Sequence, residues 1–117
     1  MYVALFIGFS GVLSAQDVEY GKASYYADEF QGRKTASGEV YHKDSLTAAH
    51  RSIPFGTRVK LTNVKNNKSV IVRINDRGPH IPGRIIDLSR KAMMMLKGID
   101  AGVIEITLEV VERKPED

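Results

Sequence analysis

The 117-residue sequence contains no cysteine. Disulfide bonds, thiolate zinc sites and cysteine nucleophiles are therefore excluded together. No apolar run is long enough to span a bilayer, so we expect no stable membrane span. The 17 Lys and Arg residues and 14 Asp and Glu residues give a net charge of +3. The positive residues are scattered along the sequence and form no basic block. Nucleic-acid binding needs a concentrated basic patch, so we expect no such partner, although this balance tolerates an anionic polymer.

Other catalytic signatures are missing as well. The three histidines, His42, His50 and His80, lack the spacing of a zinc site. No serine lies in a nucleophile-elbow pattern, and no glycine-rich loop of the phosphate-binding kind is present. We therefore expect neither a metal nor a cofactor. Acid–base chemistry by carboxyl groups is the simplest remaining option.

The N-terminal segment differs from the rest of the chain. Residues 1–15 read MYVALFIGFSGVLSA and carry no charge. The run matches the apolar region of a secretory signal peptide, with small residues Ser14 and Ala15 at a cleavage point. No Lys or Arg precedes it, which indicates a truncated start or an atypical signal; the alternative is a buried first strand or helix. We expect a secreted or periplasmic protein without a lipid anchor, because no cysteine follows the run.

The remainder of the chain has room for one domain, expected over residues 20–112, with a charged tail at 113–117. Short apolar runs, several of which alternate apolar and polar residues, are punctuated by Gly, Pro and Asn. This pattern predicts strands at 21–26, 46–50, 57–64, 69–75, 85–88 and 103–111. The two middle runs, separated by the turn residues 65–68, are typical of a β-hairpin with one face in a core.

One helix is predicted between the last two strands, over residues 90–97. Ser89 is a suitable N-cap, and Gly98 stands at the usual C-terminal position. The expected apolar stripe consists of Ala92, Met95 and Leu96. Many short strands with a single helix indicate a mainly-β barrel.

Polar residues interrupt the apolar strands in two places. Residues 73–79, RINDRGP, end a strand rich in Val and Ile, and Asn and Asp there are either turn formers or site groups. Asp87 lies within the apolar segment IIDLS. A carboxylate flanked by apolar residues is costly unless it is paired. It is either a functional group or a structural partner of Arg84, Arg90 or the helix N-terminus.

A third polar group joins Glu39 of TASGE to His50 of LTAAH. Such residues are often solvated surface or structural, and only convergence in space would make them a site. Glycan cleavage is the best-known task for a set of carboxyl groups without metal or nucleophile. Tyr25, Tyr26 and Phe30 are candidates to stack on sugar rings, but adjacent residues of a strand point to opposite faces. Only one of Tyr25 and Tyr26 is therefore expected to line a groove.

Four linked stretches carry a family resemblance: GKASYYADEFQGRKTASGE, LTAAHRSIPFGTRVKLTN, SVIVRINDRGP and GRIIDLSRKA. In this order the sequence resembles the rare lipoprotein A (RlpA) family of bacterial lytic transglycosylases over residues 21–111. The resemblance implies a six-stranded double-psi β-barrel with one short helix, a fold shared with expansins. It also implies that two crossing loops bring carboxylates to one open groove.

The resemblance assigns roles to particular residues. Asp76 and Glu39 fall at positions that the family uses for activity, and His50 is expected to line the same groove. Asp87 occupies the place of an acid in related barrels. We predict Asp76 as the acid/base, Glu39 as its assistant, and His50 or Asp87 as an orienting group. The implied substrate-binding residues are Tyr25, Tyr26, Ser37, Arg73, Asn75 and Arg77.

The implied reaction cleaves the bond between N-acetylmuramic acid and N-acetylglucosamine in peptidoglycan glycan strands and leaves 1,6-anhydro ends. We expect the glycan substrate to be poor in peptide. We expect a monomer that acts without water as a reactant. The main alternative is an expansin-like module that binds and loosens glycan without cutting it. A third class is an interaction protein that contacts cell-wall machinery, in which the groove is incidental.

Overall fold

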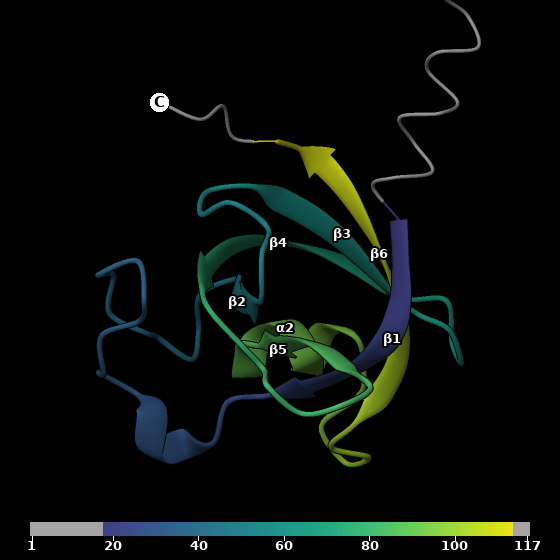
Figure 1. Cartoon of the computed structure of the whole chain (residues 1–117). Helices are drawn as coiled ribbons and strands as arrows, with labels where there is room; N and C mark the ends of the chain where they lie inside the picture. Colours follow the sequence, from purple (N-terminus) through teal and green to yellow (C-terminus); the bar gives the residue numbers. More distant parts are fainter. Residues whose placement is uncertain (1–17, 114–117) are drawn as a thin grey trace, which may run out of the picture.

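The computed structural model describes residues 18–113 (Figure 1). The expected signal peptide at 1–15 and most of the expected tail at 113–117 lie outside this range. The elements in chain order are β1 (Val18–Tyr25), η1 (Asp28–Phe30), β2 (Thr47–His50), β3 (Arg58–Asn63), β4 (Ser69–Asp76), β5 (Arg84–Leu88), α2 (Arg90–Met95) and β6 (Ile104–Glu112). All six predicted strands are present, and β1 begins earlier than predicted. No helix in the described range is long and apolar enough to cross a membrane.

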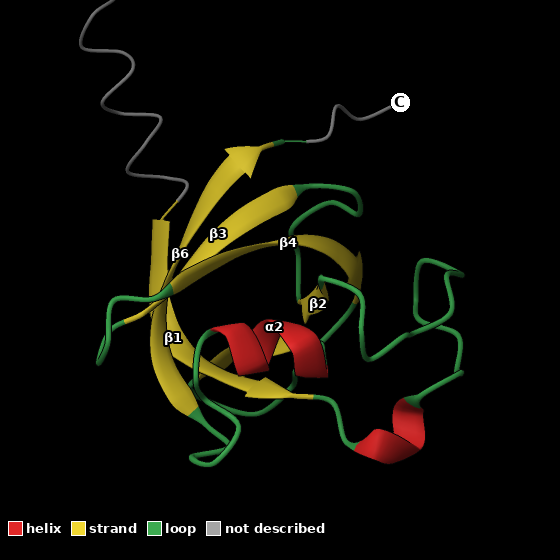
Figure 2. Cartoon of the chain, turned by 180° about the vertical axis from the view of Figure 1, so that it is seen from behind, coloured by secondary structure: helices red, strands yellow, loops and turns green. Residues whose placement is uncertain are grey.

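The six strands close into a barrel in the order β1-β5-β2-β4-β3-β6 (Figures 1 and 2). β1 runs parallel to β5 and β2 runs parallel to β4, whereas the other neighbours are antiparallel. Closure pairs both edges of every strand, which removes the open edge that promotes aggregation. The expected mainly-β, six-stranded double-psi barrel with a short helix is confirmed.

Regular alternation along β3 and β4 builds one wall of the core. Val59 and Leu61 have no exposed surface, and they pair across the hairpin with Val72 and Val70. Ile74 continues the inward row of β4. The predicted hairpin with one buried face is therefore confirmed.

The strand β6 closes the barrel between β1 and β3. Ile106 and Leu108 face inward and are buried, and Ile104 and Val110 pack against the core from either side. Burying one large aliphatic side chain stabilises the fold by about 1.5–3 kcal/mol. Burial of this row therefore stabilises the packing of β6 against the rest of the barrel.

The helix α2 packs against β1, β4 and β5. The Ser89 hydroxyl accepts a hydrogen bond from the Ala92 N–H at 3.3 Å, which confirms the predicted N-cap. Ala92, Met93 and Leu96 are buried, whereas Met95 is 45% exposed, so the predicted position of Met95 in the apolar stripe is wrong. Steps of three and four residues both follow a helix face, and the barrel contact decides which face is buried.

Gly98 has a different role from the one predicted. The residue with a positive φ after the helix is Lys97, at 58°. Gly98 is instead held against the core: a Cβ atom there would lie 2.5 Å from Met93 Sδ and 3.1 Å from two carbons of Ile104. Close packing, not backbone conformation, requires glycine at this position.

The long connection from β1 to β2, residues 26–46, is held together by stacked aromatic rings and backbone hydrogen bonds. The ring of Tyr41 is almost fully buried and stacks on the ring of Tyr26, with centroids 4.3 Å apart. The backbone of Tyr41 also exchanges hydrogen bonds with Gly32 and Arg33. This packing fixes the loop that carries Glu39.

Candidate active site

One groove of about 460 Å³ holds two carboxyl groups, from Asp76 at the end of β4 and Asp87 in β5. Tyr26 and Phe30 contribute aromatic surface to it. The loop at residues 77–81, which follows β4, supplies another part of its lining. The groove therefore combines acidic and aromatic groups, as the recognition and cleavage of a sugar polymer require.

Pairing with Ala49 places the two carboxyl groups on one face of the barrel wall. Ala49 of β2 pairs with Asp76 on one side and with Asp87 on the other. Paired residues of neighbouring strands point to the same face, and two strand spacings separate the aspartate Cα atoms by about 10 Å. The adjacent residues Ala48 and Leu88 belong to the core. Both aspartates and Ala49 therefore face outward.

A bulge in β4 turns Asp76 to this outer face. Ile74 pairs with Ala48, but Asp76 pairs with Ala49, so Asn75 is an extra residue on β4. Side chains alternate along a strand, and one additional residue reverses the side on which the next one lies. Without the bulge, Asp76 would follow the inward row of Ile74.

Three donors hold the Asp76 carboxyl group. The Tyr26 hydroxyl donates to Oδ2 at 2.6 Å. The backbone N–H groups of Ala36 and Arg77 donate to Oδ1 at 2.8 and 2.9 Å. These donors come from three different parts of the chain, so both carboxyl oxygens are fixed in position.

Tyr26 stays protonated beside this carboxyl group. Burial, and then the hydrogen bond to Asp76, raises the pKa of the Tyr26 phenol far above its ordinary value. Its ring is stacked on Tyr41 and lies edge-on to Phe30, with centroids 5.9 Å apart. Tyr26 is therefore a fixed hydrogen-bond donor over the whole physiological pH range.

Asp87 is held by a serine and not by an arginine. The Ser24 hydroxyl donates to Asp87 Oδ1, and Ser24 pairs with Asp87 in the register of β1 and β5. Arg84 donates to the Ser24 oxygen at 3.3 Å. The structural alternative for Asp87, direct pairing with Arg84 or Arg90, is not observed among the described contacts. Asp87 thus presents its carboxyl group in the groove.

Glu39 lies beside Asp76 in the loop network but does not line the same groove. Its carboxylate accepts from Arg73 at 2.9 Å and from the Asn75 side chain at 3.0 Å. The Arg73 hydrogen bond, followed by that of Asn75, holds the pKa of Glu39 below its usual value. Arg73 and Asn75 therefore hold the carboxylate of Glu39.

Ser37 braces the turn that presents Glu39. Its hydroxyl accepts from the Glu39 N–H at 3.3 Å and lies 3.0 Å from the Thr35 hydroxyl. Its own N–H donates to the Asn75 carbonyl at 3.2 Å. The 35–39 turn is thereby attached to the bulged end of β4.

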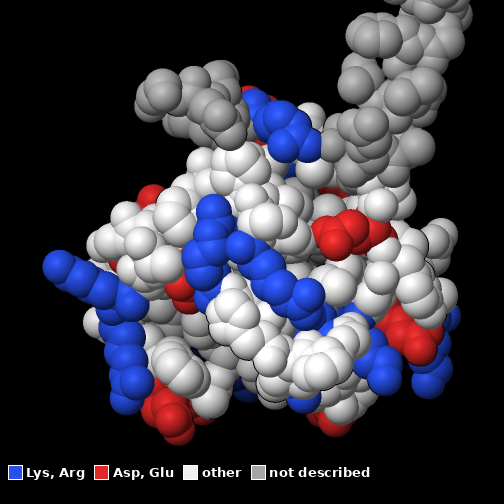
Figure 3. All heavy atoms as spheres, viewed as in Figure 1, with Lys and Arg blue, Asp and Glu red and all other residues white. Residues whose placement is uncertain are grey.

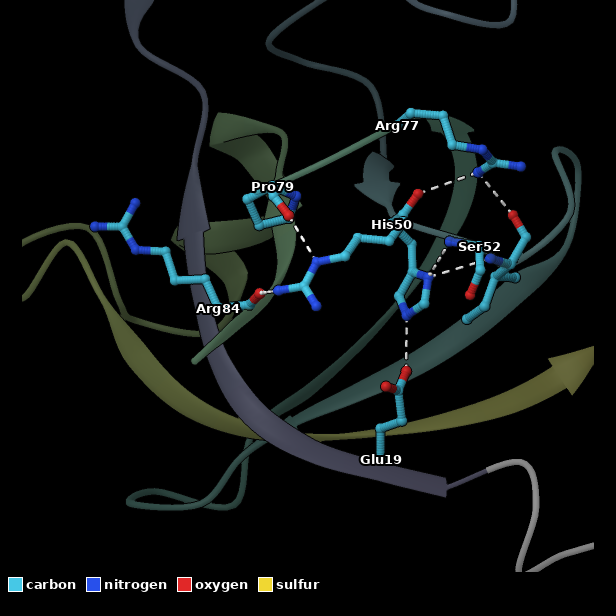
Figure 4. A network of polar contacts seen from close by, with 8 residues as sticks. Glu19, His50, Ser52, Arg77, Pro79 and Arg84 are labelled. Carbon is cyan, nitrogen blue, oxygen red and sulfur yellow. Dashed lines mark hydrogen bonds and ion pairs between the residues drawn. The ribbon is translucent and has the colours of Figure 1, made fainter. Parts of the chain in front are cut away.

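His50 does not line the groove of Asp76 and Asp87, contrary to the expectation. His50 pairs with Ile86, a core residue, so its side chain points to the inner face. Its Nε2 atom lies 2.7 Å from Glu19 Oε1, at the opposite side of β2 (Figure 4). The reason is the alternation within TAAH, which places Ala49 outward and His50 inward.

Arg77 and Tyr25 both contribute to the groove lining, but their polar groups bind other parts of the protein. The Arg77 guanidinium donates to the carbonyls of His50 and Ile53 and stacks over the Phe55 ring at 4.0 Å. Its backbone N–H donates to the Asp76 carboxylate, whereas the guanidinium reaches only the Asp76 backbone carbonyl, at 3.5 Å. Tyr25 and Tyr26 both contribute to the groove lining, so the expectation that only one would do so is wrong. Their hydroxyls still diverge, since Tyr25 donates to the Ile99 carbonyl at 3.5 Å.

Two contacts of the site were missed by the sequence reasoning, those of Ser24 and of the Ala36 N–H. Ser24 is recognisable only once β1 is known to pair with β5, and the backbone of Ala36 has no sequence signal. Within residues 18–113, no three His, Asp or Glu side chains converge in a way that could hold a metal ion. Lys and Arg are spread over the face in Figure 3, with acidic residues among them.

Known proteins resemble the chain in both sequence and structure. It is 47% identical over 104 residues to a Synechocystis protein named "Probable endolytic peptidoglycan transglycosylase RlpA", covering 89% of this chain and 32% of that protein. The Streptomyces papain inhibitor has a TM-score of 0.66 and 27% identity, over 81% of this chain and 94% of the inhibitor. An expansin from Clavibacter michiganensis has a TM-score of 0.63 and 26% identity, over 86% and 52%.

The chain spans about a third of the length of the Synechocystis relative. The family model described as "Lytic transglycolase" matches residues 18–108. This match includes both strands that carry the groove aspartates, the Glu39 loop and the Ala49 pairing. The chain therefore belongs to the lytic transglycolase family.

Proposed function

We propose that this chain cleaves the N-acetylmuramic acid–N-acetylglucosamine bond of peptidoglycan glycan strands and leaves 1,6-anhydro ends. The observation that carries the proposal is the shared pairing of Asp76 and Asp87 with Ala49, which presents two carboxyl groups in one groove. Family membership and the name of the Synechocystis relative support the same substrate.

In the proposed reaction, protonated Asp76 donates to the glycosidic oxygen as the bond to the muramoyl C1 atom breaks. The muramoyl 6-hydroxyl oxygen then bonds to C1, and its proton passes to the Asp76 carboxylate. The acid is thereby regenerated without water. The protonated Tyr26 hydroxyl and the two backbone N–H groups stabilise the carboxylate while it is charged.

Glu39 has a different proposed role from Asp76. Because its pKa is lowered, Glu39 is an anion near neutral pH and is not the proton donor. Its carboxylate is paired with Arg73 and Asn75 outside the groove, so its proposed role is to hold the 35–39 turn, whose Ala36 N–H binds Asp76. Asp87 is proposed to orient the substrate within the groove, and Tyr26 and Phe30 to contact its rings.

The proposal includes a location and a substrate form. A chain that acts on peptidoglycan works outside the cytoplasm, in the cell envelope, and the apolar segment at 1–15 is consistent with export. The proposed substrate is glycan poor in peptide, and the proposed active form is a monomer. Tyr25 and Arg77 contribute to the groove lining, whereas Ser37, Arg73 and Asn75 are proposed to act through the 35–39 turn that they hold.

The test incubates the full chain with purified glycan strands, both intact and stripped of peptides. Mass spectrometry detects 1,6-anhydro ends. Asp76→Asn keeps the size and most hydrogen bonds of the side chain but cannot donate the proton. Asp100→Asn is the matched control, since Asp100 is exposed and does not line the groove.

Anhydro products from the parent and from Asp100→Asn, absent with Asp76→Asn, are the expected result. Reducing ends in place of anhydro ends would contradict the water-free route and identify a hydrolase. Equal product from Asp76→Asn would remove Asp76 from the reaction.

A second candidate function is glycan binding without cleavage, favoured by the likeness to the Clavibacter expansin. The two functions differ in one measurement. Glycan that sediments with the chain, while no new ends form under any condition, would favour the binding module.

A further inference from the structure

A second polar network surrounds the inward-facing residue of β2 (Figure 4). His50 stands at its centre, with a side chain only 7% exposed. Its Nδ1 atom accepts hydrogen bonds from the N–H groups of Ser52 and Ile53, both at 3.1 Å. An imidazole nitrogen that accepts carries no proton. The proton therefore resides on Nε2, which donates to Glu19 Oε1 at 2.7 Å.

This tautomer shapes the turn that follows β2. With Ser52 and Ile53 both tied to Nδ1, the carbonyl groups of His50 and Ile53 converge on one nitrogen of Arg77, at 3.1 and 2.9 Å. The guanidinium is also stacked over Phe55. The Arg77 guanidinium therefore lies against a turn that is held by His50 Nδ1.

Arg77 connects this turn to the reacting carboxyl group. Its backbone N–H donates to Asp76 Oδ1 at 2.9 Å. A shift of the Arg77 side chain is transmitted to its own backbone and so to Asp76. A displacement near 1 Å costs about 100-fold in rate for a positioned catalytic group.

A reciprocal contact runs from the same turn to the groove wall. Arg51 donates to the carbonyls of Pro79 at 2.8 Å and Arg84 at 2.6 Å (Figure 4). The turn after β2 therefore supplies Arg51, which binds carbonyl groups of the segment 79–84. The segment after β4 supplies Arg77, which binds carbonyl groups of the turn after β2. The turn after β2 is the common element of both contacts.

We propose that Glu19 and His50 form a positioning pair: Glu19 holds the Nε2–H tautomer of His50, which shapes the 51–53 turn and thereby seats Arg77 and Asp76. His50 acts through the backbone and does not touch substrate. This inference rests on the proposed function for its kinetic consequence, but its structural consequence is measurable without turnover.

The decisive comparison is His50→Asn against His50→Gln. The Asn carboxamide oxygen can occupy the position of Nδ1 and accept from Ser52 and Ile53, whereas the Gln amide reaches the position of Nε2. His50→Asn should exceed His50→Gln in kcat by at least about tenfold. The same comparison applies at Glu19. Glu19→Gln keeps a hydrogen-bond acceptor for His50 Nε2–H, so its kcat should be higher than that of Glu19→Ala. Glu29→Ala, at an exposed glutamate of η1, is the matched control.

A second readout is independent of catalysis. In ¹H–¹⁵N spectra, the amide signals of Ala36 and Arg77 report the Asp76 hydrogen bonds. They should shift in His50→Gln and Glu19→Ala and remain near parent positions in His50→Asn and Glu19→Gln. Imidazole ¹⁵N shifts of the parent should identify the Nε2–H tautomer.

The outcomes separate this proposal from the proposed function. If the parent yields no anhydro ends but the amide shifts follow the expected order, the positioning pair stands and the proposed reaction fails. If His50→Asn and His50→Gln lose activity equally while both amide signals stay in place, the ring itself acts in the reaction and the positioning proposal is overturned.

Discussion

The two halves of the barrel wall follow different rules. In the half formed by β3, β6 and the first part of β4, side chains alternate regularly from Val59 onward in β3, and the inward rows are aliphatic. In the half formed by β2, β5 and the end of β4, the buried aliphatic residues of β5 lie beside small and polar residues of β2 and β4, and the β2–β4 register contains a bulge. Regular alternation builds the core, whereas the bulge directs the Asp76 carboxyl group outward.

The contrast extends to the polar contacts. Val59 and Leu61 contribute through burial alone, while Asp76, Asp87 and His50 each need specific donors or acceptors. Changes in the regular half should therefore affect stability, and changes in the irregular half should affect activity. The predictions that follow test this division, from the largest expected effect to the smallest.

The largest expected effect is on catalysis at Asp76. Asp76→Asn should lower kcat by about 10²–10⁴-fold, the usual contribution of a general acid or base. Asp87→Asn should cost about tenfold, because an Asn at this position still accepts from Ser24. Rates of anhydro-end formation measure both. A larger loss at Asp87 would reassign the proton donor.

Leu61→Ala tests the regular half. It removes a side chain with no exposed surface from the centre of the core and should lower the free energy of unfolding by about 2–5 kcal/mol. Urea unfolding measures the change. The rate per folded molecule should stay at the parent level, and a selective loss of kcat would contradict the division between the halves.

Tyr26→Phe tests the connection between aromatic packing and the site. The ring stacking on Tyr41 is kept, but the hydroxyl donor to Asp76 is lost. Both remaining hydrogen bonds are to Oδ1, so Oδ2 is no longer fixed in position, and kcat should fall by about tenfold or more. Tyr41→Phe is the control, since its hydroxyl accepts from the Arg90 N–H away from Asp76.

The smallest expected effect is the pH dependence of the Glu39–Arg73 pair. The folded state lowers the pKa of Glu39 below its ordinary value of 4.5, so the pair stabilises the fold above that pH. Its contribution disappears as the pH falls through the lowered folded-state value. The Glu39 and Arg73 side chains are 46% and 40% exposed, and exposed ion pairs contribute little to stability. The free energy of unfolding of the parent should therefore be higher than that of Glu39→Gln by at most about 1 kcal/mol at pH 7. Urea unfolding at pH 7 and pH 3 checks the sign: a difference that grows at pH 3 would contradict the lowered pKa.

Local patterns were sufficient for much of the fold. Alternation at 59 and 61 and at 70, 72 and 74 located two core strands, and the N-cap Ser89 located the start of α2. Local patterns gave the wrong residue where two nearby positions fitted the same pattern. Met93, not Met95, is buried, and Lys97, not Gly98, has the positive φ.

The site residues divide in the same way. The sequence motifs singled out Asp76 and Asp87, and the barrel brings both to one groove. Their convergence depends on the pairing of β2 with both β4 and β5, which no local pattern contains. The direction of His50 depends on the same pairing, and so it was expected on the wrong side of β2.

By itself the sequence determined where strands and turns lie and which polar residues interrupt them, because side-chain alternation and capping are properties of a few neighbouring residues. Only the tertiary structure decided which of those polar residues face each other. The Asn75 bulge turns Asp76 outward, Ala49 stands between two aspartates, and His50 meets Glu19 from another strand. Each of these depends on the register between strands that are distant in the chain, and that register is settled by the packing of the whole barrel.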